Sequence, residues 1–156
     1  MSIKNIRPDR KYKGAKYVPI NEGKYVGSGP IICRSSWEVK YCMYCDRTDD
    51  ILAWSSEPIY IKYFNKLTGK YHKYYPDFWI RVKTKKGTLK EYLVEIKPKS
   101  QTQKPTAPKR KTPQALKNYK YSVETYIKNL CKAKAAKEYA ESVGMEYIIL
   151  TEESIK

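Results

Sequence analysis

The sequence lacks the residues and patterns on which several common protein classes depend. His72 is its one histidine, and the chain has neither a serine–histidine triad pattern nor a glycine-rich phosphate-binding loop. No stretch reaches the roughly 18 apolar residues of a membrane-spanning helix, and Met1 leads into a polar, basic segment unlike a signal peptide. We therefore expect no membrane association and no organic cofactor.

Cysteine is scarce, and its spacing gives only part of a metal motif. Cys42 and Cys45 have the C-x-x-C spacing of zinc sites, and Cys33 lies nearby. However, Cys42 and Cys45 fall within one expected helix, and no second pair completes a tetrahedral set. Reduced, packed cysteines in a cytosolic protein are the preferred interpretation, with a zinc site as the alternative.

Acidic residues are few compared with basic ones. The chain has 16 aspartates and glutamates against 32 lysines and arginines, a net charge of +16. Such an excess favours a polyanionic partner, and we expect double-stranded DNA. A length of 156 residues suits a single domain, residues 1–156.

Much of the positive charge gathers in two segments, an N-terminal arm (about 1–30) and a proline-rich loop (about 98–117). Residues 98–123 contain no acid at all, and prolines interrupt the first half of this stretch. Because the loop leaves the strand that carries Glu95 and Lys97, we expect its cations to lie near the site of cleavage. The residues expected to bind DNA are Lys99, Lys104, Lys109, Arg110, Lys111 and, upstream, Arg34. The alternative is a flexible, solvated insertion.

Two acids and a lysine fall on one face of an expected β-hairpin. The segment Trp79 to Leu93 reads as a hairpin with its turn at Lys85-Lys86-Gly87. A turn centred on Lys86 places Asp77 opposite Glu95, and alternation puts Lys97 on the same face. Opposed like charges repel unless a cation lies between them, so this pattern favours a divalent metal site. The alternatives are a solvated hairpin face, a bulge or a different register.

A third acid, Glu38, opens an expected helix over residues 36–47. Ser35 and Glu38 have the S-x-x-E spacing of a capping box, so the Glu38 carboxylate has two possible roles. It either bonds the helix start or completes a metal shell with Asp77 and Glu95. The residues alone leave these roles open.

The remaining elements complete an α/β prediction. Strands are expected near 51–64, 71–83 and 89–97, a helix near 118–143, and a short strand over 145–150, after the helix-stopping Gly144. We expect a small mixed sheet flanked by helices.

Seven short motifs resemble a known nuclease family. They occur in order: Arg34-Ser35-Ser36-Trp37-Glu38, Tyr44-Cys45-Asp46, Trp54-Ser55-Ser56-Glu57, Gly69-Lys70-Tyr71-His72, Tyr75-Pro76-Asp77-Phe78, Glu95-Ile96-Lys97-Pro98 and Ile149-Leu150-Thr151-Glu152. An acid on a first helix, a Pro-Asp strand and a Glu-x-Lys strand resemble the PD-(D/E)xK superfamily. The whole set resembles the head-completion nucleases of tailed bacteriophages, whose core is related to transposon-encoded restriction-like endonucleases.

The resemblance implies a restriction-endonuclease-like core and a catalytic set of Glu38, Asp77, Glu95 and Lys97. It implies Mg²⁺ or Mn²⁺ held by Asp77, Glu95 and the Ile96 carbonyl, with Glu38 bound directly or through water. The implied role is a metal-dependent DNA endonuclease that finishes packaged DNA ends in the host cytoplasm, with head, portal or neck proteins as partners and association with the virion. The alternatives are a transposon-end or junction endonuclease and a noncatalytic DNA-binding head protein.

Overall fold

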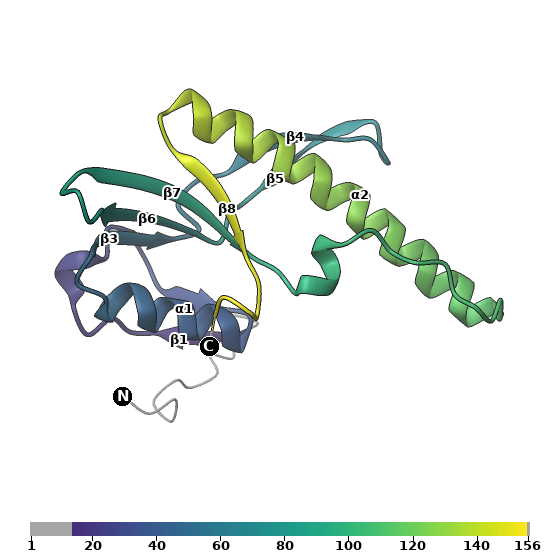
Figure 1. The fold of residues 1–156 in the computed structure, drawn as a ribbon, viewed down its shortest axis with the longest axis horizontal. Coiled ribbons are helices and arrows are strands. Elements are labelled where there is room, and N and C mark those ends of the chain that lie inside the picture. The colour runs from purple at the N-terminus through teal and green to yellow at the C-terminus, as the bar shows by residue number, and fades with distance from the viewer. Residues whose placement is uncertain (1–13, 156) are drawn as a thin grey trace.

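A computed structural model describes residues 14–155, and the part of the predicted basic arm before Gly14 lies outside them. Within the described range the chain forms eight strands, two α-helices and two short 3-10 turns (Figure 1). In chain order they are β1 (Ala15–Tyr17), η2 (Glu22–Lys24), β2 (Ile31–Cys33), α1 (Ser36–Arg47), β3 (Ile51–Ser56), β4 (Ile61–Asn65), β5 (Lys70–Tyr74), β6 (Phe78–Lys83), β7 (Leu89–Ile96), η3 (Lys99–Thr102), α2 (Pro113–Ser142) and β8 (Glu146–Leu150).

The central sheet is mixed, with strand order β3-β6-β7-β8. The β3–β6 and β6–β7 pairs are antiparallel, and β7–β8 is parallel. Helix α1 and the β1–β2 ribbon cover one face, while α2 and the β4–β5 ribbon cover the other (Figure 1). The predicted α/β architecture is therefore confirmed.

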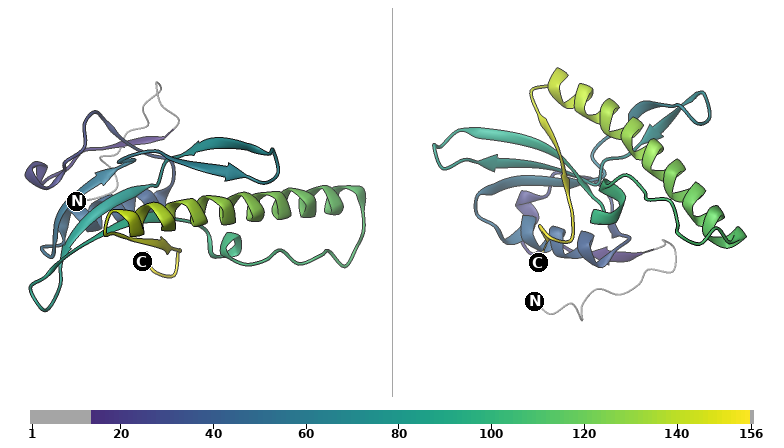
Figure 2. Two further views of the ribbon diagram at one scale, coloured as in Figure 1. Left: turned by 90° about the horizontal axis from the view of Figure 1, so that it is seen from above. Right: turned by 45° about the vertical axis from the view of Figure 1, so that its right-hand side comes forward.

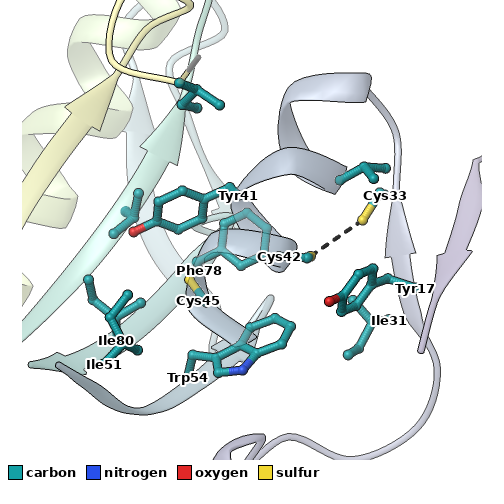
Figure 3. Close-up of a cluster of buried hydrophobic side chains, with 13 residues drawn as sticks. Tyr17, Ile31, Cys33, Tyr41, Cys42, Cys45, Ile51, Trp54, Phe78 and Ile80 are labelled. Carbon is teal, nitrogen blue, oxygen red and sulfur yellow. Dashed lines mark hydrogen bonds between the residues drawn. The ribbon is translucent and has the colours of Figure 1, made fainter. Parts of the chain in front are cut away.

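The larger core lies between the sheet and α1. Trp54 and Phe78 are fully buried there, with Tyr17 and Tyr41 packed around them (Figure 3). Asp46 at the end of α1 is also fully buried; its carboxylate accepts hydrogen bonds from the Tyr17 hydroxyl (2.8 Å) and from the Ile20 and Asn21 amides. This carboxylate fixes the segment after β1 to the body of the protein.

Cys33, Cys42 and Cys45 belong to this core, Cys131 of α2 packs against the second core, and the four form no metal site within the described residues. All four are free, and Cys33 Sγ lies 3.5 Å from Cys42 Sγ (Figure 3). Burial raises the pKa of the Cys45 thiol to about 12, so it stays protonated. The burial of Cys33, Cys42 and Cys45 agrees with the interpretation as packed cysteines, and their reduced state stays a prediction.

Two of the predicted strands are each divided in the structure. The expected strand 51–64 is interrupted after Ser56, where Glu57 has a φ of 45° and Pro58 cannot donate to a ladder. The expected strand 71–83 is interrupted at Tyr75–Asp77. The β4–β5 ribbon between these breaks leaves the sheet and packs on α2. The Glu57 amide donates to the Asp77 carbonyl (2.9 Å) and closes the ribbon's base.

Helix α2 is longer than predicted and begins within the expected loop. Thr112 caps it by accepting from the Ala115 amide (3.2 Å), and Pro113 occupies the first turn, where its missing N–H costs nothing. Only the C-terminal half of α2, with buried Ala136 and Ala140, packs on the sheet. The N-terminal half projects beyond it, and the loop from Pro98 runs back alongside (Figure 2). No helix in the described range is long and apolar enough to cross a membrane.

Candidate active site

The predicted hairpin register is confirmed, and it brings the two acids together. Phe78 pairs with Val94 and Ile80 with Tyr92, so one further step places Asp77 beside Glu95. Asp77 Oδ2 accepts a hydrogen bond from the Ile96 amide (2.8 Å). Burial, and next the negative charge of Glu95, raise the pKa of Asp77 to about 8. The charge of Glu95 therefore destabilises the ionised form of Asp77.

This face is enclosed by protein, which contradicts the alternative of a solvated hairpin face. Glu95 and Lys97 are each only 8% exposed. Lys97 Nζ lies 3.1 Å from Glu95 Oε1, and the Tyr74 hydroxyl donates to Glu95 Oε2. The Tyr74 hydroxyl also lies 3.0 Å from that of Tyr147, on β8. Burial and the charge of Glu95 raise the pKa of Tyr74, which keeps it protonated and able to donate.

Helix α2 contributes residues that the sequence analysis missed. Asn129 Oδ1 accepts a hydrogen bond from Lys97 Nζ (3.3 Å). One turn on, Lys132 lies over the Tyr74 ring, with Nζ 5.3 Å from its centre. Burial, and then the charges of Lys97 and Lys128, lower the pKa of Lys132. Asn129 and Lys132 continue the small-residue face of Ala136 and Ala140 at helical spacing, and this periodicity was the signal that could have located them.

Glu38 occupies the helix cap in the structure. Its amide donates to Ser35 Oγ (3.1 Å), its Oε1 lies 3.3 Å from the same hydroxyl, and its Oε2 accepts from the Arg34 amide (3.0 Å). One half of the predicted capping box is therefore formed, because Ser35 caps the Glu38 amide, while the Glu38 carboxylate accepts from the Arg34 amide in place of the Ser35 amide. Burial raises the pKa of Glu38, and its charge contributes to the raised pKa of Asp77, so the three acids share one electrostatic neighbourhood.

Known proteins place this arrangement in an endonuclease family. The family model described as TnsA-like endonuclease N terminal matches residues 48–152, more than half of the chain. The chain belongs to this endonuclease family. A curated relative, named head completion nuclease, from Enterobacteria phage T4, is 38% identical over 146 residues, covering 93% of this chain and 94% of the relative. No solved structure matches. The resemblance to head-completion nucleases is confirmed, and with it the endonuclease class.

The acids of this endonuclease fit a hard divalent cation by their chemistry. Mg²⁺ and Mn²⁺ prefer carboxylate, carbonyl and water oxygens, and the site offers two carboxylates whose mutual repulsion a cation would relieve. Among residues 14–155, no three histidine, cysteine, aspartate or glutamate side chains are gathered closely enough to form a complete shell alone. Glu38, the third acid, is held by the cap. Its metal role, like that of the Ile96 carbonyl, stays a prediction.

The predicted DNA-binding residues lie in different places. Arg34 forms an exposed ion pair with Glu57. Lys99 Nζ pairs with Glu153 (2.6 Å) on the segment after β8. Lys104 is exposed on the loop that runs along α2.

The expectation that the loop's cations lie beside the site is wrong for its second half. Lys109, Arg110 and Lys111 directly precede the start of α2 at Pro113. The site contact, Asn129, lies roughly 24 Å further along the helix at about 1.5 Å per residue. These three cations are exposed at the far end of a projecting arm (Figure 2).

Proposed function

We propose that this endonuclease hydrolyses DNA phosphodiester bonds with Mg²⁺ or Mn²⁺ held by Asp77 and Glu95. The observation that carries the proposal is the mutually repelling carboxylate pair of buried Glu95 and half-buried Asp77, with the Lys97 ammonium 3.1 Å from Glu95. A bound divalent cation would polarise the scissile phosphate and activate water for attack. Such a pair has no evident structural purpose, because apolar residues would pack there at lower cost.

The chain's own residues hold this site in place. The Ile96 amide fixes one oxygen of Asp77, while Tyr74 and Lys97 each fix one oxygen of Glu95. Lys97 in turn is oriented by Asn129. Lys97 is therefore positioned to neutralise charge that grows on the phosphoryl oxygens, or to move a proton of the attacking water. Glu38 would join the metal shell directly or through water when its cap contacts are released.

The DNA partner follows from charge and shape. The projecting arm carries basic residues along its length and no acid between residues 98 and 123. The separation of its tip from Asn129, roughly 24 Å, spans about seven base pairs of duplex at 3.4 Å per pair. We propose that the arm tracks the phosphate backbone beside the cut.

The proposed biological role is completion of phage heads by finishing DNA ends after packaging, in the host cytoplasm. Head, portal or neck proteins are the proposed protein partners, and the protein associates with the virion. The similarity to the phage relative across nearly the whole chain supports this role. The family match supports a second candidate, an endonuclease that selects DNA ends or junctions. Its preference for branched over plain duplex DNA would separate it from the first.

Cleavage of supercoiled plasmid DNA tests the proposal. We expect nicking or linearisation with Mg²⁺ or Mn²⁺, none with EDTA, and none by Asp77→Asn. Glu91→Gln is the matched control, because Glu91 lies on the same strand as Glu95 and pairs with Arg81 (3.6 Å) away from the site. Normal cleavage by a folded Asp77→Asn protein would overturn the proposed site.

A further inference from the structure

The outward face of the β4–β5 ribbon carries an ordered ladder of aromatic and lysine pairs. Lys62 pairs directly with Lys73 and Phe64 with Tyr71. Just beyond the ribbon's base, Tyr60 and Tyr75 continue the ladder with ring centres 6.1 Å apart. Aromatic, lysine and aromatic pairs thus follow one another along the ribbon, and residues 58–76 contain no acid.

Packing within the protein explains only part of this arrangement, because one lysine, Lys73, lies over the Tyr60 ring with Nζ 4.6 Å from its centre. The opposite face of the ribbon, with Ile61, Tyr63 and Tyr74, packs against α2. The outward rings remain open: Phe64 is 46% exposed, and Tyr71 is 72% exposed. Directly opposed lysines destabilise a ribbon, because like charges repel across the strands. The Phe64 and Tyr71 rings contact each other, with centres 5.4 Å apart.

The surface extends into a groove beside the ribbon. A cavity of about 690 Å³ separates its tip from α2, and Phe64 and Tyr71 form part of one wall. Leu130 of α2 contributes apolar surface, and Lys62, Lys66 and Lys134 are basic lining residues against one acid, Glu138. Aromatic walls and basic rims together match a ligand that has flat apolar rings and negative charge.

We propose that this face binds unpaired, single-stranded DNA. Exposed rings offer stacking platforms for bases, which is sequence-tolerant because every base has a π face. The lysine pairs offer point charges to phosphates, and successive pairs on one face lie roughly 6.7 Å apart along a strand. Bases inside a duplex are already stacked on one another, so the exposed rings favour binding of an unpaired strand. A protein partner would leave the paired lysines without a counterpart unless it were acidic.

The ribbon joins the candidate active site at its base. Tyr75 is two residues from Asp77, and the preceding residue, Tyr74, on the opposite face, donates to Glu95. A strand bound along the ladder would therefore lead toward the carboxylate pair, so the endonuclease would act where an unpaired end meets a duplex. This link to cleavage rests on the proposed function, whereas binding of the unpaired strand does not.

The first test measures binding by fluorescence anisotropy in EDTA, where cleavage plays no part. The probes are a labelled oligothymidine of about 15 nucleotides, near the upper site size of single-strand binding folds, and a duplex of equal length. We expect Phe64→Ala/Tyr71→Ala to weaken single-strand binding at least tenfold, since one stacked base contributes about fivefold or more. Duplex binding should change far less. Tyr44→Ala, at an exposed tyrosine of α1, is the matched control and should leave both affinities unchanged.

A second double variant, with its own control, tests the lysine pair while the melting temperature checks that the protein remains folded. Lys62→Ala/Lys73→Ala removes the opposed charges together with the contact of Lys73 on the Tyr60 ring, so it should change the melting temperature little while it weakens single-strand binding. Loss of two phosphate contacts predicts a salt slope shallower by about 1.4, at roughly 0.7 per contact. Lys85→Ala/Lys86→Ala, at the exposed β6–β7 turn, should change neither quantity.

Two outcomes would overturn the proposal. Equal weakening of duplex and single-strand binding by Phe64→Ala/Tyr71→Ala would make the ladder a general DNA surface. Unchanged DNA binding in both ladder variants would assign the face to another kind of partner. Neither outcome depends on cleavage, and loss of cleavage in Asp77→Asn with intact single-strand binding would leave the proposal standing.

Discussion

The Lys97 ammonium lies 3.3 Å from the side-chain oxygen of Asn129, so helix α2 reaches across to the strand that carries the acids. The Asn129 amide nitrogen is buried without a hydrogen-bond partner in the part of the chain that the structure describes. A buried, half-satisfied amide beside a site lysine suggests a residue kept for positioning and not for packing.

We predict that Asn129→Ala slows cleavage about 10- to 100-fold with little loss of DNA affinity, because partners that orient site residues typically contribute that much in metal sites. The measurement is the single-turnover rate with Mg²⁺, beside the melting temperature. Asn118→Ala on the exposed half of α2 is the control. A normal rate in Asn129→Ala would show that Lys97 needs no support from the helix.

The raised pKa of Asp77 predicts an unusual pH dependence of stability in the metal-free protein. An aspartate of ordinary pKa 3.8 is ionised in the unfolded chain above about pH 4, whereas the native carboxyl holds its proton to about pH 8. Because the native state binds more protons across this window, the free energy of unfolding falls as pH rises from about 4 to about 8.

Asp77→Asn removes this titration and should flatten the curve. In EDTA at pH 8, we expect the variant to melt at a higher temperature than the natural protein. Thermal melts across the window, with the exposed Asp49→Asn as control, provide the measurement. A curve that keeps its slope in Asp77→Asn would assign the pH dependence to other groups.

Glu38→Gln should separate the two roles of this residue. Glutamine preserves a capping box, so the melting temperature should change little. It is a poorer ligand for a divalent cation, so cleavage should fall. A large loss of stability with normal cleavage by the folded fraction would identify Glu38 as a cap alone.

The tip of the basic arm should contribute affinity for DNA without sequence specificity. Neutralising Lys109, Arg110 and Lys111 together should weaken binding equally on unrelated duplexes. If each contacts one phosphate, the salt slope becomes shallower by about 2.7, at roughly 0.9 per contact. A triple variant of Lys83, Lys85 and Lys86 controls for total charge, since these residues are exposed on a different hairpin. An unchanged slope in the arm variant would remove the tip from the DNA interface.

The β6–β7 hairpin was predictable because several local signals agree. Strict alternation gives one apolar face, and Gly87, with a φ of 80°, fixes the turn. Together they set the register that places Asp77 beside Glu95. The capping box at Glu38 and the end of α2 before Gly144 follow from equally local chemistry.

The rest of the site depends on packing between distant segments. In the sequence, the β4–β5 ribbon looks continuous with the strands before and after it. Pro58 and Pro76 mark the breaks, but they do not show in which direction the chain continues. Tyr74 reaches Glu95 only because the ribbon folds over onto α2. Helical spacing from Ala136 and Ala140 could place Asn129 on the inward face of α2, but its contact with Lys97 is visible only in three dimensions.

Calorimetric titration of Mn²⁺ into the metal-free protein at pH 8 tests the central claim, that Asp77 and Glu95 hold a divalent cation, most directly. The account predicts saturable binding by the natural protein and by Glu91→Gln, with proton release as Asp77 ionises, and loss of that binding in Asp77→Asn and Glu95→Gln. Equal Mn²⁺ affinity and stoichiometry in all four proteins would contradict it.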